Sequence, residues 1–187
     1  MRSHFSPFTL HLSPSLTMCG IAGIISPDPE RRIAAMLETI EHRGRDDEGV
    51  WTSQAIDDSG RHACLGHRRL AIIDTSKAGH QPMLSADGRY VLSFGGEIYN
   101  YRDLREELKS KGYEFATKTD TEVLLTAFAE WGKECLPRLN GMFHFAVWDN
   151  QERTLTLARD HVGIKPLYYF YEPASSTKPG FSFSHRK

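Results

Sequence analysis

One short run constrains this chain more than any other feature. Residues 18–25 read MCGIAGII, which places Cys19 at the head of a continuous apolar stretch punctuated by glycines. A run of this kind predicts a strand buried on both faces. Cysteine is among the residue types most often found in protein interiors, so one interpretation of Cys19 is an inert core residue.

The position of Cys19 directly after Met18 allows a second interpretation. If the mature chain began at Cys19, that residue would carry both a thiol and a free α-amine. An α-amine has an unperturbed pKa of about 7.7–8.0, and it can serve as the general base for the thiol of its own residue. Cys19 is therefore also a candidate nucleophile.

The remaining patterns predict an α+β domain with strands at both ends and helices between them. Predicted strands cover 19–25, 63–73 with an interruption at Gly66, 90–94 with an end at Gly95 and Gly96, 143–148, 154–158, 167–171 and 181–183. Predicted helices cover about 33–40, a segment from 101 that stops at Gly112, and a segment from a capping box of Thr119 and Glu122 to Trp131.

Composition excludes several classes of function. A net charge of −1 over 187 residues gives no field that would favour nucleic acid or an acidic membrane. No apolar stretch approaches the roughly 20 residues of a membrane span. Three cysteines lie far apart without CxxC spacing, which argues against a disulfide framework and a thiolate zinc site. Such sparse cysteines favour a reducing compartment, and we expect the cytoplasm.

Seven motifs follow Cys19 in order. They are HRGRDDEG at 42–49, LGHRRLAIID at 65–74, AGHQPM at 78–83, FGGEIYNY at 94–101, TDTEVLL at 119–125, RLNGMF at 138–143 and RDHVGIKPLYY at 159–169. With these motifs, residues 18–183 closely resemble the amino-terminal glutaminase domain of glutamine-hydrolysing asparagine synthetases, which are class II glutamine amidotransferases. The resemblance implies the four-layer αββα sandwich of N-terminal-nucleophile hydrolases. It also implies that Cys19 attacks L-glutamine, releases ammonia from a glutamyl thioester and leaves glutamate after hydrolysis.

The resemblance assigns two residues to holding the substrate. Arg69 matches the arginine that binds the glutamine carboxylate through paired charge-assisted hydrogen bonds. Successive strand residues point to opposite faces, so only one of Arg68 and Arg69 can face a pocket. Asp120 matches the aspartate that receives the α-ammonium. Each residue also has a structural explanation, because the arginines could cap a sheet edge and the helix dipole favours an aspartate in a first turn.

The resemblance also assigns the site for the oxyanion. Gly96 matches the glycine whose backbone N–H faces it, and Glu97 follows among the substrate-binding residues. Gly95 departs from the family, which generally has asparagine in an NGEIYN run as a second, side-chain donor. Loss of one such donor typically lowers kcat by about 10²–10³-fold, so sequence alone predicts a weakened site that Gly95→Asn would repair. Three further departures are His144, where a small residue is usual, Arg45, where proline is usual, and His161, where arginine is usual.

Residues 1–17 look foreign to the domain, which we expect to span 18–187. The segment is rich in Ser, Pro and His and has no acidic residue. We expect it to reflect a start codon assigned too far upstream or a removable leader. The glutaminase step needs no cofactor and no metal. ATP and magnesium would belong to a synthetase domain that this chain lacks, which would act as a partner domain or subunit.

Two other interpretations stay open at this point. The chain could be a truncated, catalytically impaired remnant that binds glutamine or a partner without turnover, which Gly95 and the extension before Cys19 favour. It could also serve another class II system, such as glucosamine-phosphate or phosphoribosylamine synthesis. The GHRRLAIID and GIKPLYY runs count against that assignment.

Overall fold

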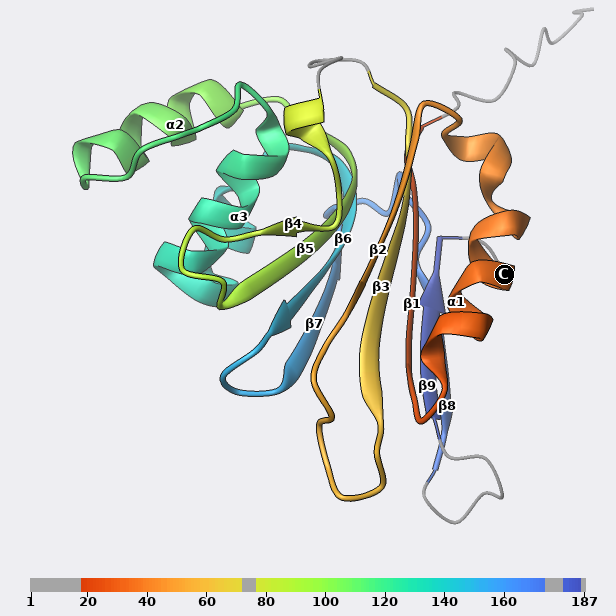
Figure 1. Cartoon of the computed structure of the whole chain (residues 1–187). Coiled ribbons are helices and arrows are strands. Elements are labelled where there is room, and N and C mark those ends of the chain that lie inside the picture. The colour runs from red at the N-terminus through yellow and green to blue at the C-terminus, as the bar shows by residue number, and fades with distance from the viewer. Residues whose placement is uncertain (1–17, 72–76, 174–179, 186–187) are drawn as a thin grey trace, which may run out of the picture.

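Two antiparallel β-sheets lie face to face in the computed structural model, which describes residues 18–71, 77–173 and 180–185 (Figure 1). The first sheet has the strand order β2-β3-β1-β9-β8, and the second has the order β4-β5-β6-β7. The strands of the first sheet are β1 (Gly20–Ser26), β2 (Asp47–Thr52), β3 (His62–Arg69), β8 (Tyr168–Glu172) and β9 (Gly180–Ser184). Those of the second sheet are β4 (Met83–Leu84), β5 (Tyr90–Ile98), β6 (Gly141–Asp149) and β7 (Thr154–Arg159).

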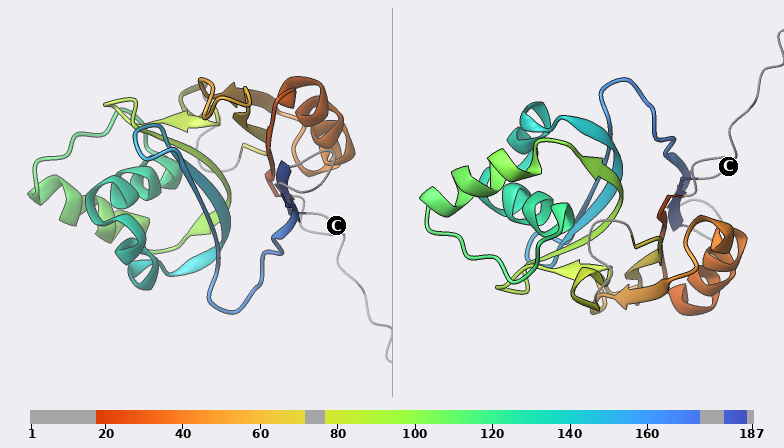
Figure 2. Two further views of the ribbon diagram at one scale, coloured as in Figure 1. Left: turned by 90° about the horizontal axis from the view of Figure 1, so that it is seen from below. Right: turned by 90° about the horizontal axis from the view of Figure 1, so that it is seen from above.

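Helices cover the two outer faces of this pair of sheets (Figure 2). Helix α1 (Pro29–Thr39) buries Ile33 and Leu37 against β1 and β3. Helices α2 (Tyr101–Ser110) and α3 (Asp120–Trp131) pack on the second sheet. The order of helix, sheet, sheet and helix confirms the predicted αββα sandwich. None of the described helices is long and apolar enough to cross a membrane.

The space between the sheets is filled by every second residue of the facing strands. Val91 of β5 and Trp148 of β6 meet Ile21 and Leu65 of the first sheet there, while their chain neighbours face α2 and α3. This alternation also turns residue 95 and its cross-strand partner, His144, toward the first sheet.

Several strand boundaries differ from the prediction. Strand β3 runs through Gly66 without a break, because Gly66 pairs with Ala22 of β1 and Val50 of β2. Its missing side chain makes room for Leu37 of α1, whose methyl groups would lie 3.0 Å from a β-carbon. Strand β5 continues through Gly95 and Gly96, since both pair with β6. Strands β2 and β4 were not predicted, because β2 is a charged edge strand and β4 has two residues. Residues 72–73 of the predicted 63–73 strand and the extension 1–17 lie outside the described residues.

The start of α3 is fixed by side chains. Thr119 Oγ1 accepts a hydrogen bond from the backbone N–H of Glu122 at 3.1 Å, as the predicted capping box requires. The Glu122 carboxylate instead accepts from the backbone N–H groups of Ala116 and Thr117. This network holds Asp120, the first residue of α3, at the end of the sandwich where β1 begins and β3 ends.

Candidate functional site

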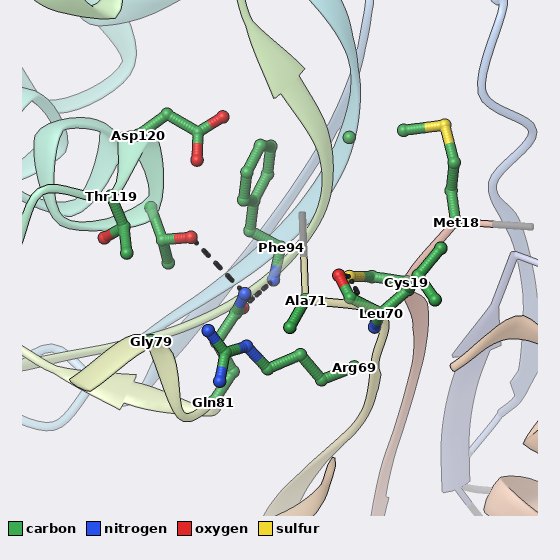
Figure 3. Close-up of a pocket in the computed structure, with 12 residues that line it drawn as sticks. Met18, Cys19, Arg69, Leu70, Ala71, Gly79, Gln81, Phe94, Thr119 and Asp120 are labelled. Carbon is green, nitrogen blue, oxygen red and sulfur yellow. Dashed lines mark hydrogen bonds between the residues drawn. The ribbon is translucent and has the colours of Figure 1, made fainter. Parts of the chain in front are cut away.

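A small cavity of about 60 Å³ opens at this end of the sandwich (Figure 3). Cys19, Arg69, Gly96 and Asp120 all line it, whereas Gly95 and Glu97 are not among the lining residues. The remaining lining residues are Met18, Leu70, Ala71, Gly79, Gln81, Phe94, Thr119 and Thr121. A larger cavity of about 540 Å³ lies between β4 and α3, and it contains none of the predicted site residues.

The Cys19 thiol is held at the entrance to β1 by the backbone of Leu70. Its Sγ accepts a hydrogen bond from the Leu70 N–H at 3.3 Å and donates one to the Leu70 carbonyl at 3.4 Å. Burial raises the pKa of Cys19, and the Leu70 hydrogen bond and the charge of Arg69 offset this only in part. The thiol is therefore neutral at pH 7 and needs a base to become a nucleophile.

The two adjacent arginines of β3 point to opposite faces, as the strand alternation predicts. Arg69 turns into the cavity and is 7% exposed, with its guanidinium directly against Gly79, so that a side chain there would have to displace it. Arg68 forms an ion pair with Glu48 and donates from Nε to the Leu37 carbonyl at 3.3 Å. A structural role therefore accounts for Arg68, while Arg69 lies with Cys19.

Asp120 is a buried acid facing the same cavity. Its Oδ2 accepts a hydrogen bond from the backbone N–H of Ile98 at 3.0 Å. Burial raises the pKa of Asp120 to about 6, and the charge of nearby Glu97 adds to this effect against the Ile98 hydrogen bond. A buried carboxylate with a raised pKa gains stability when a cation approaches. Glu97 thus influences the site through its charge.

The glycine pair of β5 divides into two roles. Gly96 has φ of +143°, a conformation that side chains rarely adopt, and it lines the cavity. A β-carbon at Gly95 would collide with His144 Nε2 and would lie 2.9 Å from the Cys19 carbonyl oxygen. The side chain that Gly95→Asn would add therefore meets the His144 ring, so the single repair predicted from sequence does not fit.

Sequence reasoning did not assign Gln81 or Thr121 to the site, although both line the cavity. Gln81 is 4% exposed, accepts the backbone N–H of Phe94 at 2.7 Å through Oε1 and donates from Nε2 to Thr121 Oγ1 at 3.4 Å. It therefore links β5 to α3 across the site. The sequence did contain an indication of this residue, because Gln81 lies within the AGHQPM motif that carried part of the resemblance.

Met18 is part of the cavity wall. It is buried, and its Sδ contacts Nζ of Lys165. Burial lowers the pKa of Lys165, and the nearby charge of Arg43 lowers it further. Removal of Met18 would thus enlarge the cavity beside Cys19. In the described part of the chain, no group of three or more His, Cys, Asp or Glu side chains is placed to hold a metal ion.

Residues 18–185 match the family described as the glutamine amidotransferase domain. The chain belongs to this family. The amidotransferase domain is 39% identical over 173 residues to asparagine synthetase [glutamine-hydrolyzing] 3 of Bacillus subtilis, covering 89% of this chain and 26% of that protein. It is 36% identical over 160 residues to asparagine synthetase B of Escherichia coli, covering 83% and 27%. The chain thus spans about a quarter of the length of these relatives.

The fold has a counterpart among solved structures. Glutamine phosphoribosylpyrophosphate amidotransferase from B. subtilis superposes with a TM-score of 0.70 at 22% sequence identity, covering 89% of this chain and 42% of that chain. At this identity the likeness concerns the fold, and it agrees with the αββα layering.

Proposed function

We propose that this domain hydrolyses L-glutamine to glutamate and ammonia through a thioester on Cys19. The observation that carries the proposal is the convergence of Cys19, Arg69, Gly96 and Asp120 on one cavity from separate parts of the chain. A nucleophile, a cation, a backbone donor and an anion are the groups that a zwitterionic amino-acid amide needs.

In the proposed reaction, Arg69 binds the α-carboxylate and Asp120 binds the α-ammonium, which directs the carboxamide to Cys19. As Sγ attacks, its proton passes to the Cys19 α-amine, a C–S bond forms and the carbonyl electrons move to the oxygen beside the Gly96 N–H. Collapse breaks the C–N bond, and the nitrogen leaves as ammonia with the transferred proton. Water then hydrolyses the thioester to glutamate.

This chemistry requires that the active form begin at Cys19. The raised pKa of the buried thiol makes a base necessary, and a peptide bond to Met18 would remove the basicity of the α-amine. The test compares ammonia release by protein processed to Cys19 with protein that retains Met18, each checked by intact mass. Equal rates would exclude the amine as the base.

We further propose that the ammonia serves asparagine synthesis in the cytoplasm. The names of the similar proteins support this use, as they are glutamine-hydrolysing asparagine synthetases. The glutaminase step itself uses no cofactor in this proposal. ATP and magnesium would act in a synthetase domain or subunit that receives the ammonia.

One experiment separates turnover from binding alone. Ammonia and glutamate are measured with glutamine for protein processed to Cys19, and glutamine binding is measured by calorimetry on the same sample. Equimolar ammonia and glutamate support the proposal. Binding without either product would identify the impaired remnant, and absence of both would exclude glutamine as the ligand.

A further inference from the structure

Two departures from the family pattern lie opposite each other in this structure. Gly95 of β5 and His144 of β6 are cross-strand partners, and both face the layer between the sheets. A β-carbon on Gly95 would lie 2.9 Å from His144 Cδ2 and closer still to Nε2. The imidazole therefore occupies the space where a side chain at position 95 would begin. The two positions form one packing unit.

In the part of the chain that the structure describes, one hydrogen bond orients the His144 ring. His144 Nδ1 lies 3.1 Å from the carbonyl oxygen of Pro166. A carbonyl oxygen only accepts, so Nδ1 carries the proton in the neutral ring and Nε2 has the lone pair. Among the described residues Nε2 has no hydrogen-bond partner, and His144 is 0% exposed. Such an atom is rare in a folded protein and needs an explanation.

The location of this nitrogen supplies one. The β-carbon position that Nε2 crowds at Gly95 is also 2.9 Å from the Cys19 carbonyl oxygen, so Nε2 lies beside the nucleophile residue. Gly96, which follows Gly95, lines the cavity. Neither Gly95 nor His144 lines the cavity itself, but Nε2 lies directly behind Gly95, on the side of Cys19 where the family resemblance locates the missing side-chain amide.

We propose that His144 is a further catalytic residue of the glutaminase site, whose Nε2 shares a proton with the oxygen of the tetrahedral intermediate. This inference rests on the proposed glutamine hydrolysis. When Sγ bonds to the carboxamide carbon, the thiol proton, carried by the Cys19 α-amine, comes to lie between that oxygen and Nε2. On collapse the proton returns to the Cys19 α-amine, which passes it to the leaving nitrogen as the C=O bond reforms and the C–N bond breaks. Nε2 ends with its lone pair restored.

The surroundings keep the resting ring neutral, as this cycle requires. Burial lowers the pKa of His144 to about 3, and the charges of His185, Lys165 and Arg43 act in the same direction. The ring of His185 lies 5.6 Å away between centroids. A negative oxygen beside Nε2 would oppose these effects, so His144 accepts the proton only when the intermediate forms.

A set of four proteins, each processed to Cys19, tests the inference by kcat and KM for glutamine. Removal of the ring in His144→Ala should lower kcat by about 10²-fold with little change in KM, as for loss of one oxyanion partner. Gly95→Asn alone should also lose activity, because the added side chain collides with the ring. The double variant Gly95→Asn/His144→Ala should recover at least the original kcat. His67→Ala is the matched control, because His67 is a buried histidine of the same layer whose Nε2 lies 3.0 Å from the Phe94 carbonyl.

A spectroscopic readout keeps the inference testable if a variant fails to fold. An aldehyde analogue of glutamine, with –CHO in place of the carboxamide, adds to Sγ and forms a tetrahedral thiohemiacetal. The ¹⁵N resonance of His144 Nε2 in the unsubstituted protein should move from the region of an unprotonated ring nitrogen toward that of an N–H group when the adduct forms. The His67 resonances should not move in this way.

The outcomes are distinct. An unchanged Nε2 resonance in a formed adduct, or wild-type kcat in His144→Ala, would overturn the role of His144 while glutamine hydrolysis stands. Turnover by the double variant with none in the unsubstituted protein would show that His144 blocks the site, which also overturns the inference. Absence of adduct and of turnover in both proteins would reject the proposed function and this inference with it.

Discussion

The two sides of Cys19 are built in different ways. On one side, Arg69 and Asp120 come from the end of β3 and the start of α3, and each side chain faces the cavity directly. On the other side, Gly95 has no side chain, and His144 from the next strand fills the space. The first side depends on single residues, and the second depends on a cross-strand pair.

This difference has a consequence for mutation. A residue whose side chain shares no volume with another can be replaced and its loss measured directly. Gly95 and His144 share one volume, so a change at either position alters the other, and only the double variant isolates the missing amide. A change at Arg69 or Asp120 should therefore leave the packing of the other residue intact, whereas a change at Gly95 or His144 should not.

The nucleophile is common to both sides, and its loss should have the largest effect. Cys19→Ser in protein processed to residue 19 should lower kcat by at least about 10⁴-fold, as removal of a catalytic nucleophile does elsewhere. Cys64→Ala and Cys135→Ala are the controls, since Cys64 lies under α1 and burial raises the pKa of Cys135 to about 12. A glutamine-like diazoketone should label Cys19 alone. Label on another cysteine, with Cys19 unmodified, would contradict the assignment.

The adjacent arginines offer a matched pair for the substrate-holding side. Arg69→Ala should lower kcat/KM by about 10²-fold, mainly through KM, because truncating one partner of a desolvated charge pair costs about 2–5 kcal/mol. Arg68→Ala removes the same side chain from the opposite face, where it pairs with half-exposed Glu48, and should change kcat/KM less than threefold. Steady-state kinetics on both variants tests this difference in kcat/KM. Equal losses would mean that Arg69 acts through the fold.

The residues of the substrate-holding side could be predicted from the sequence, and the reasons are physical. Strand alternation separated Arg68 from Arg69, and the Thr119 cap located Asp120 at a helix start. Both signals are local, so they can be read along the chain. The local patterns also predicted an α+β layered domain, and the resemblance refined this to two sheets between helical layers.

The oxyanion side could not be predicted in the same way. The contact between Gly95 and His144 depends on the register of β5 against β6, which no local pattern fixes. The glycine pair also suggested an end to β5, whereas pairing with β6 carries the strand to Ile98. The departures at Gly95 and His144 look independent in the sequence. In the structure they are coupled, because the His144 ring fills the space that a side chain at position 95 would need.

Acid should weaken glutamine binding through Asp120. Burial raises the pKa of this carboxyl to about 6, so below that pH it is neutral and no longer attracts the substrate ammonium. Calorimetry on the inactive Cys19→Ser protein should show Kd rising up to about tenfold per pH unit below 6. Asp120→Asn should bind weakly at every pH without this dependence. A flat Kd between pH 5 and 7 in the parent would reject the ammonium-binding role.

The smallest expected effect concerns stability, and it distinguishes the two sides once more. In Asp120, a folded-state pKa above the unfolded value means that ionisation destabilises the empty domain above pH 6. Asp120→Asn should therefore raise the free energy of unfolding by about 1–3 kcal/mol at pH 7.5, and this gain should fade toward pH 4 as the parent carboxyl becomes protonated. Denaturant unfolding at the two pH values measures it.

Asp160 provides the control with the opposite sign, and it lies on the oxyanion side, between β7 and the loop that carries Pro166. Burial raises its pKa, but hydrogen bonds from the backbone N–H groups of Lys165, Ile164 and Phe143 outweigh this and hold the pKa below the usual range. Its ionised form thus stabilises the fold above pH 4, and this stabilisation is lost as pH falls. Asp160→Asn should destabilise at pH 7.5 and approach neutrality in acid. Destabilisation by both variants at pH 7.5 would mean that Asp120 is held as a structural acid like Asp160, without the electrostatic strain that a bound ammonium would relieve.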